Sequence, residues 1–321
     1  MLRLVLATLL LALASTARAE TWPDRPIKII TAAGPGAALD TLTRKLAEAL
    51  QKELGQPVIV DNKPGANQII AATACANARP DGYTFCTTAT EPYTNNVFLF
   101  RNLPYDPTNG FAPVAMLANQ LAGIVVRKEL GAETLQDVVA YSRAHPGKLN
   151  WGSYSIGSNS HLYLEAVRQE TGWAVTHIPY RDVTNLTQGL LANDVQLAYA
   201  VLDDKIQRQI ADGTLKLIAY AGTARSPLYP DVPTFEELGL ESYRIRGWYG
   251  LLAPAGTPPA IVERVNRTAM EVMNSPDMKT ILQALSVAPV AAHAPADMAA
   301  NIRRNRDVVG SSLQRANVQA Q

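Results

Sequence analysis

Short β-rich runs alternate with amphipathic stretches along most of this chain, and this alternation restricts the fold more than any other feature of the sequence. The first strand, at 27–31, is followed by a helical pattern at 40–54 whose leucines recur every four residues, and Gly55 ends it. Strands at 58–62 and 83–88 then enclose a helix near 68–78. Strand–helix–strand units of this kind predict a mainly parallel sheet covered by helices.

A second set of strands and helices begins at residue 123 and predicts a second sheet. The predicted strands cover 123–127, 149–153, 174–180, 195–201 and 215–222, and the helices cover 134–144, 159–171, 184–193 and 204–212. After a strand at 248–254 the chain is mostly helical, at 258–273, 276–285 and 295–315, with one short strand between the last two helices. At 321 residues one core usually gives way to two. We therefore expect two α/β domains, 20–122 with 247–321, and 123–246.

Residues 1–19 have the features of a secretory signal peptide and belong to neither domain. Arg3 supplies a positive start, Leu4 to Ala14 form an apolar run, and Ala17-Arg18-Ala19 is a small-x-small cleavage site. The apolar run is too short to span a bilayer. We expect cleavage after Ala19 and a soluble mature protein in the periplasm.

The charge balance argues against nucleic-acid binding. Without the two arginines of the leader, 27 basic residues face 28 acidic ones. A nucleic-acid-binding protein would show a basic patch or stripe. The longest basic cluster, Arg303, Arg304 and Arg306, lies on what we interpret as the solvated face of the last helix.

The two cysteines, Cys75 and Cys86, stand on either side of a Pro80-Asp81-Gly82 turn. In an exported chain they could form a disulfide or remain two buried thiols. Neither state carries chemistry, because a catalytic cysteine needs a histidine and a positive setting beside it.

The stretch GSYSIGSNSHL, at 152–162, combines glycines, serines and a histidine just before a predicted helix. A nucleophile elbow requires Gly-x-Ser-x-Gly, and the spacing here fails by one residue. A phosphate loop requires a lysine where Ser158 stands, and no Gly-x-Gly-x-x-Gly follows the first strand. His161 would lie in the first turn of a helix, where the dipole disfavours the imidazolium that a general base becomes. These mismatches argue against hydrolase and nucleotide-binding functions.

One function of this stretch needs only backbone geometry. A glycine- and hydroxyl-rich turn between a strand and a helix start presents unpaired N–H groups, which bind anions. The loop AGPGAALD, at 33–40, has the same relation to the first strand. Since ligands of open α/β sheets bind beyond the carboxyl ends of the strands, the two loops could hold one small anion across a cleft. The alternative is that each loop merely caps its helix.

The sequence resembles the tricarboxylate-transporter type of periplasmic solute-binding receptor, often called the Bug family, through most of the mature chain. The resemblance lies in ordered blocks: WPDRPIKII (22–30), AGPGAALD (33–40), LGQPVIVDNKPGAN (54–67), PDGYT (80–84), LPYDP (103–107), HPGKLNWGS (145–153), GSNSHL (157–162), HIPY (177–180), DGTLKLIAYA (212–221), YPDVPTFEELGL (229–240) and GWYGLLAPAGTP (247–258). It implies an α/β, type II periplasmic-binding-protein fold, in which two α/β domains joined by two crossing segments close on a carboxylate in the cleft between them.

The resemblance also implies the ligand-binding residues. It places one carboxylate seat at Gly36, Ala37, Ala38, Leu39 and Asp40, a second-domain seat at Ser153, Gly157, Ser158, Asn159, Ser160 and His161, and a third polar stretch at Thr88 and Thr90. We expect Asp40 to be a helix N-cap, because one carboxylate has little reason to approach another. His161 could instead be a packed residue that orients its loop. We expect Trp248 to pack at the hinge, and His145, His177 and His293 have no spacing typical of a metal site.

Departures from the family pattern bear on the ligand. The usual proline-glycine-glycine of the first loop is Gly34-Pro35-Gly36-Ala37 here, and Arg181-Asp182 replaces the expected lysine-glycine pair. Ala200-Val201-Leu202 stands where many relatives have polar residues. A cleft wall that loses polar groups suits a less polar ligand. We therefore expect an organic acid with an apolar or aromatic framework rather than citrate or an amino acid.

The resemblance implies a receptor that performs no chemistry and has no cofactor. It would deliver a small carboxylate to a tripartite tricarboxylate-type membrane permease, and we expect a monomer. Two alternatives from other classes stay open. One is a ligand-binding input protein for a sensor kinase, and the other is an exported serine hydrolase using Ser155 or Ser158.

Overall fold

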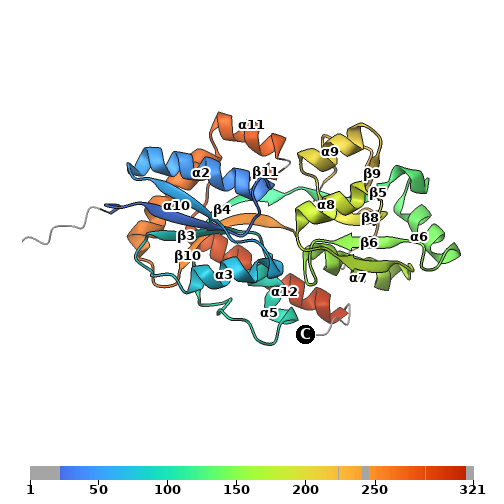
Figure 1. The fold of residues 1–321 in the computed structure, drawn as a ribbon, viewed down its shortest axis with the longest axis horizontal. Helices are drawn as coiled ribbons and strands as arrows, with labels where there is room; N and C mark the ends of the chain where they lie inside the picture. The colour runs from blue at the N-terminus through green and yellow to red at the C-terminus, as the bar shows by residue number, and fades with distance from the viewer. Residues whose placement is uncertain (1–21, 223, 241–245, 286, 316–321) are drawn as a thin grey trace, which may run out of the picture.

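The computed structural model describes residues 22–222, 224–240, 246–285 and 287–315, so the predicted signal peptide lies outside the described residues. The chain forms two lobes that lie side by side, each built around one sheet with helices on its faces (Figure 1). None of the described helices is long and apolar enough to cross a membrane.

Domain 1, the first lobe, contains a sheet of six strands in the order β11-β4-β10-β3-β1-β2. β1 pairs in parallel with β2 and β3, whereas β10 runs antiparallel to β3 and β4. The strands are β1 (Ile27–Thr31), β2 (Val58–Asn62), β3 (Thr84–Thr88), β4 (Phe111–Gln120), β10 (Trp248–Pro254) and β11 (Val287–Pro289). The helices are α2 (Ala38–Leu54), α3 (Ile69–Ala76), α4 (Glu91–Thr94), α5 (Asn96–Leu99), α10 (Pro259–Met273), α11 (Pro276–Ala284) and α12 (Pro295–Arg315), with a 3-10 turn η1 (Ala66–Gln68).

Domain 2, the second lobe, contains a sheet of five strands in the order β7-β6-β8-β5-β9. β6 pairs in parallel with β7 and β8, and β5 runs antiparallel to β8 and β9. The strands are β5 (Ala122–Arg127), β6 (Asn150–Ser153), β7 (Thr176–Pro179), β8 (Leu197–Val201) and β9 (Leu215–Tyr220). The helices are α6 (Leu135–Ala144), α7 (Asn159–Thr171), α8 (Val183–Leu191) and α9 (Asp204–Ala211), with a 3-10 turn η2 (Lys128–Leu130).

The hydrophobic pattern of the sequence explains why these segments fold as they do. The leucines of α2, spaced four residues apart, form one buried stripe that packs with β1 in the core of domain 1. β8 is buried along its whole length, as expected for a central strand covered on both faces. Most predicted strands and helices are present, several with the predicted bounds.

The main element missing from the sequence prediction is β4. No strand was expected between residues 89 and 122, yet β4 pairs with both β10 and β11 and leads directly through Leu121 into β5 of domain 2. Its sequence, FAPVAMLANQ, is rich in alanine, contains Pro113 and lacks two-residue alternation, so local rules disfavour a strand. Pairing on both sides overrides these preferences.

The last helix, α12, spans both lobes, although the predicted division gives it to domain 1 alone. Met298 and Ile302 pack in a domain 1 cluster with Trp248, whereas Val309 and Leu313 join the core of domain 2. α12 therefore connects the lobes in addition to the crossing from β4 to β5 (Figure 1).

Two further predictions concern single residues of domain 1. Arg306 is not on a solvated face: its guanidinium donates to the carbonyls of Tyr93 and Pro107 and to the hydroxyl of Thr108. Trp248 is 1% exposed and stacks on Tyr93, so it packs at the crossover as predicted.

Cys75 and Cys86, whose state the sequence left open, form a disulfide. The bridge ties α3 to β3 across the turn between them.

Candidate functional site

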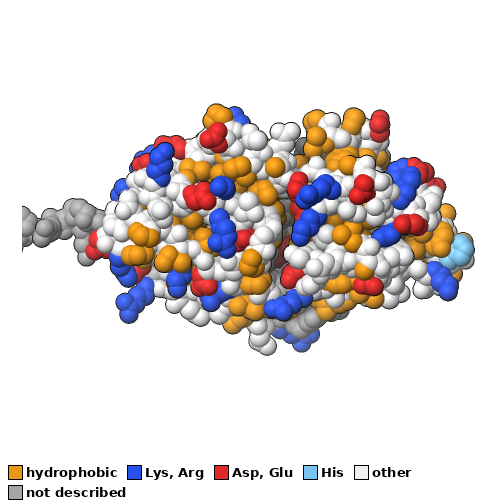
Figure 2. All heavy atoms as spheres, turned by 45° about the horizontal axis from the view of Figure 1, so that its top comes forward, with side chains coloured by type: hydrophobic (Ala, Val, Ile, Leu, Met, Phe, Trp, Pro, Cys, Tyr) orange, Lys and Arg blue, Asp and Glu red, His pale blue; other side chains and the backbone are white. Residues whose placement is uncertain are grey.

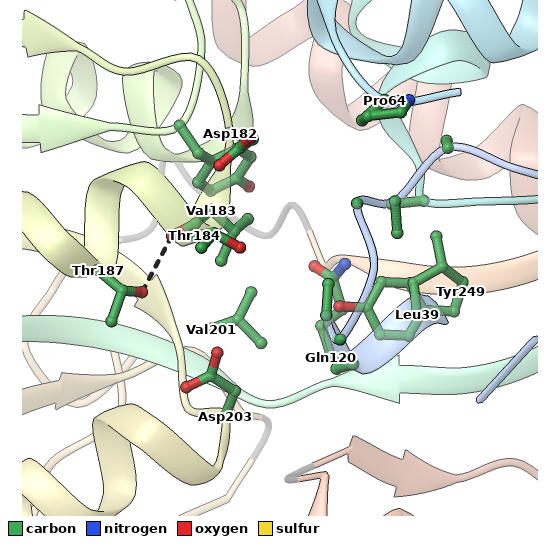
Figure 3. A pocket seen from close by; sticks show the side chains of 18 of the residues that line it. Leu39, Pro64, Gln120, Asp182, Val183, Thr184, Thr187, Val201, Asp203 and Tyr249 are labelled. Carbon is green, nitrogen blue, oxygen red and sulfur yellow. Dashed lines mark hydrogen bonds between the residues drawn. The ribbon is translucent and has the colours of Figure 1, made fainter. Parts of the chain in front are cut away.

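A cavity of about 350 Å³ lies between the two lobes, and both contribute to its walls. The space-filling view shows the furrow into which it opens, with acidic and basic side chains along its edges (Figure 2). In close-up, Leu39, Pro64, Gln120 and Tyr249 of domain 1 face Asp182, Val183, Val201 and Asp203 of domain 2 (Figure 3). Most of the surface is apolar; its apolar residues are Ala32, Ala33, Ala37, Ala38, Leu39, Pro64, Ala89, Tyr154, Val183, Val201, Tyr249 and Leu285.

The domain 1 wall is built on the loop between β1 and α2. Gly36 has a φ of 80°, a left-handed conformation that glycine adopts without strain, and this turn brings the start of α2 to the cavity. The N-cap residue is Ala37, whose side chain has no oxygen to accept from the first helical N–H groups. Within the described part of the chain, the N–H groups of Ala38 and Leu39 have no acceptor. Four of the five predicted residues, Gly36 to Leu39, line the cavity.

Asp40, the fifth predicted residue of this seat, lies behind the loop and not on the cavity wall. Its carboxylate accepts from the N–H of Gly36 at 2.9 Å and from the amide of Asn62 at 2.7 Å, and it pairs with Arg44 at 3.0 Å. Burial alone would raise the pKa of Asp40, but hydrogen bonds from Arg44, Asn62 and Gly36 together lower it below its usual value. Its predicted role as N-cap is wrong, because α2 begins at Ala38. Asp40 instead holds the Gly36 turn in place.

The domain 2 wall comes mainly from the starts of α8 and α9, which the sequence analysis did not name as ligand-binding. Asp182 caps α8 by accepting from the N–H of Asn185, and Asp203 caps α9 by accepting from the N–H groups of Lys205 and Ile206. A sequence signal existed, since each aspartate follows a strand and precedes an amphipathic helix. Charged side chains on this wall are Arg181, Asp182, Asp203, Asp204, Lys205 and Arg208.

Both departures from the family pattern noted in domain 2 reach the cavity. Arg181 and Asp182 line it, and Val201 lines it at the end of β8. Ala200 and Leu202, on either side of Val201, point into a buried cluster of domain 2. The described residues hold no ion pair for Arg181 or Lys205, so two cations at the mouth are available to a ligand.

The predicted second-domain seat does not line the cavity. Ser158 caps α7 by accepting from the N–H of His161, so this helix start is partly satisfied from within. Asn95 of domain 1 donates to the carbonyl of Gly157 and to the side chain of Asn159, at 3.2 and 2.8 Å. The loop before α7 is therefore packed against domain 1, where it joins the two lobes.

The remaining residues of that predicted seat serve the interior of domain 2. The hydroxyl of Ser160 donates to the carbonyl of Gly152, and the hydroxyl of Ser153 lies 2.7 Å from Nε2 of His177. His161 accepts from the N–H of Gly157 and stacks on His177 with ring centres 4.4 Å apart. His161 thus orients the loop, which was the alternative to a ligand contact. Burial lowers the pKa of His177 to about 4, with a smaller effect from His161 and Arg168.

The third predicted stretch, at Thr88 and Thr90, reaches the cavity through the neighbours of the two predicted threonines. Thr88 and Thr90 are buried and do not line it, whereas their neighbours Ala89 and Glu91 do. Thr88 donates to the side-chain oxygen of Gln68 at 2.9 Å, which helps to fix Gln68 on the cavity wall.

Glu91 is the most unusual group of the cavity, and the sequence analysis did not select it. It borders the cavity yet is only 1% exposed. Its two carboxyl oxygens receive Gln68 at 2.9 Å and the hydroxyl of Tyr154, from domain 2, at 3.2 Å. Burial raises the pKa of Glu91, and hydrogen bonds offset only part of that effect. Within the described ranges no group of three or more His, Cys, Asp or Glu residues could hold a metal ion.

Comparison with known proteins assigns this architecture to a family. Residues 42–309 match the family described as "Tripartite tricarboxylate transporter family receptor". The chain is 33% identical over 285 residues to Protein BugT of Bordetella pertussis, covering 87% of this chain and 86% of BugT.

Solved structures of similar proteins have the same fold as this chain. The structure of Rpa4515 of R. palustris with adipate is 27% identical, with a TM-score of 0.87 over 94% of this chain and 100% of that one. MatC of Rhodopseudomonas palustris with bound malate is also 27% identical, with a TM-score of 0.83 over 91% and 100% of the two chains. The fold is the two-domain, type II fold of periplasmic binding proteins.

Proposed function

Because this chain belongs to the tripartite tricarboxylate transporter receptor family, we propose that it captures a small organic carboxylate between its two domains in the periplasm. The signal peptide ending at Ala19 would direct export, and a membrane permease of the tripartite tricarboxylate class would receive the ligand. The observation that carries this proposal is the uncapped start of α2 in the wall of the interdomain cavity.

An uncapped helix start suits reversible capture of an anion. The N–H groups of Ala38 and Leu39 point from the positive end of the α2 dipole. A hydrogen bond to a charged acceptor is worth roughly 1.5–3 kcal/mol, so a few of them support micromolar affinity of about −8 kcal/mol. Gly36 to Leu39 would bind the carboxylate, and Asp40 would hold their turn.

The cavity walls favour a ligand with an apolar body. Leu39 and Tyr249 of domain 1 face Val183 and Val201 of domain 2 (Figure 3). Such walls stabilise an aliphatic or aromatic framework better than the hydroxyl group and third carboxylate of citrate. Arg181, which has no ion pair among the described residues, could hold a second carboxylate at the mouth of the cavity. The relatives solved with adipate and malate support a small dicarboxylate as one member of this class.

We assign the loop before α7 a different role from that first predicted. Ser153, Gly157, Ser158, Asn159, Ser160 and His161 would hold the two lobes together through Asn95 and would not touch the ligand. Ligand contacts in domain 2 would come from the starts of α8 and α9.

The contacts of Ser155 and Ser158, the two serines considered for a hydrolase, disfavour catalysis and support a receptor. Ser158 donates to the carbonyl of Ser155, and Ser155 donates to the carbonyl of Ile156, so neither hydroxyl contacts a base. The serine that does contact a histidine, Ser153, is fully buried and outside the cavity.

Titration calorimetry of the mature protein, residues 20–321, tests the proposal with adipate, benzoate, citrate and aspartate. We expect adipate or benzoate to bind at least tenfold more tightly than citrate and aspartate. A preference for citrate or aspartate would contradict the apolar ligand class. Deleting the gene separates transport from sensing, because a receptor loses uptake whereas a sensor-kinase partner loses ligand-dependent transcription.

A further inference from the structure

Glu91 occupies a position that the proposed function does not explain. A carboxyl group beside an anion-binding cavity repels the ligand when the carboxyl group is ionised. Glu91 lines the same cavity as the α2 start and has no ion pair among the described residues.

The orientation of Gln68 fixes one of the hydrogen bonds to Glu91. The backbone N–H of Ala89 donates to Oε1 of Gln68 at 2.8 Å, so the amide nitrogen of Gln68 must point the other way, toward Glu91. On the other carboxyl oxygen, the hydroxyl of Tyr154 can donate to an ionised Glu91 or accept from a protonated one. The cluster of Glu91, Gln68 and Tyr154 is thus built for either charge state without rearrangement.

The groups around Glu91 do not neutralise it. The ionisable side chains that feel the charge of Glu91 are Tyr154, Tyr199 and Tyr249, and burial raises the pKa of all three, so they stay neutral. α12 packs on α4, but its Arg306 is directed at the carbonyl of Tyr93. The other charges of the cavity all belong to domain 2: Arg181, Asp182, Asp203, Asp204, Lys205 and Arg208.

We propose that Glu91 is a specificity-determining residue that admits an anionic ligand only in its neutral, protonated form, so that carboxylate capture weakens as Glu91 loses its proton. This inference rests on the proposed carboxylate-binding function. In the protonated state the carboxyl group can keep its contact with Gln68 and donate to Tyr154. The raised pKa of Glu91 agrees with this state.

The size of the cavity sets the expected effect. A sphere of about 350 Å³ is roughly 9 Å across, and we take this length as the order of magnitude of the separation between Glu91 and a bound carboxylate. At an effective dielectric constant of about 20, two like charges at that separation reduce the affinity about 20-fold. Removing the charge of Glu91 should therefore matter about as much as one hydrogen bond to the ligand.

Glu91→Gln is the appropriate variant, because glutamine is neutral at every pH and can accept from Gln68 and donate to Tyr154. Infrared difference spectra of the ligand-free variant and wild type test the charge state directly. We expect the carbonyl band of a protonated acid in wild type at a pH where exposed glutamates are already ionised, and its loss in Glu91→Gln. Absence of that band in wild type would overturn the neutral state even if no carboxylate binds.

Calorimetry with adipate and benzoate at rising pH, starting at about pH 6.5 where both ligands are ionised, tests the coupling to capture. We expect the affinity of wild type to fall about 20-fold as Glu91 ionises, and that of Glu91→Gln to stay within threefold. Glu48→Gln, the same change at a side chain 64% exposed on α2, should behave like wild type. The proposal fails if Asp203→Asn, rather than Glu91→Gln, removes the pH dependence, or if affinity rises with pH. Failure of both probes to bind, with the infrared band present, would count against the carboxylate receptor and not against the neutral Glu91.

Discussion

Placing an aspartate at the start of α2 should stabilise the protein and abolish binding at the same time. Ala37 is the N-cap residue, and its backbone, with φ −73° and ψ 159°, already has the extended conformation of capped helices. In Ala37→Asp the new carboxylate would accept from the N–H groups that now face the cavity. The variant therefore fills the proposed seat with a group that the chain itself supplies.

The two effects have opposite signs and can be estimated separately. Replacing alanine by aspartate at an N-cap contributes about 1 kcal/mol, with a range of roughly 0.5–2. An aspartate at the N-cap accepts from the N–H of Leu39 or Asp40, so a ligand that loses the N–H of Leu39 gives up roughly 1.5–3 kcal/mol and also meets a like charge at the seat. The affinity for adipate or benzoate should fall more than about 100-fold.

Urea denaturation measures the first effect and titration calorimetry the second. A matched control is Ser275→Ala, which removes the hydroxyl that caps α11 outside the cavity wall. That variant should lose about 1 kcal/mol of stability and keep its affinity. If Ala37→Asp gains stability but binds the ligand within threefold of wild type, the carboxylate is held elsewhere and our assignment of the seat is wrong.

Three further outcomes follow from the structure. Asp40→Asn should lower the free energy of unfolding by roughly 1–3 kcal/mol at pH 7. Because the pKa of Asp40 is lowered in the folded state, wild type should lose this extra stability as the pH falls from about 4 through that pKa, whereas the stability of the variant should not change for this reason. Urea denaturation at each pH measures both. The double variant Cys75→Ala, Cys86→Ala should lose about 3 kcal/mol, as expected for a loop of this length, and reduction of wild type should reproduce the loss in thermal denaturation. Asn159→Ala should remove the acceptor that lies 2.8 Å from the buried amide of Asn95, and so lower the free energy of unfolding by roughly 1–3 kcal/mol. Any change in the calorimetric affinity should come from altered closure of the two lobes, because Asn159 does not line the cavity. An unchanged free energy of unfolding would contradict the interdomain contact.

Local signals predicted those elements whose ends depend on nearby residues. The helix expected at 159–171 has these bounds in the structure, because Ser158 caps its start and Gly172, in the left-handed conformation, ends it. The start of α2 was placed two residues late, because Ala37 is not a capping residue. That local irregularity coincides with the proposed seat, as is common at functional sites.

The second wall of the cavity could not be predicted from local pattern. The sequence shows several helix starts in domain 2 that look alike, and which of them faces domain 1 depends on how the two sheets are turned. The start of α7 is used in contacts with Asn95, so the starts of α8 and α9 form the wall instead. The role of Glu91 could not be predicted from local pattern either, because part of its burial comes from Tyr154, which is 63 residues away in the chain.

The sequence by itself determined most of the strands and helices, the family and the glycine turn before α2, because each depends on neighbours along the chain. Only the tertiary structure decided that β4 is a strand, that α12 spans both lobes and that a buried acid faces the interdomain cavity. Those features depend on contacts between segments far apart in the chain, whose energies no local pattern records.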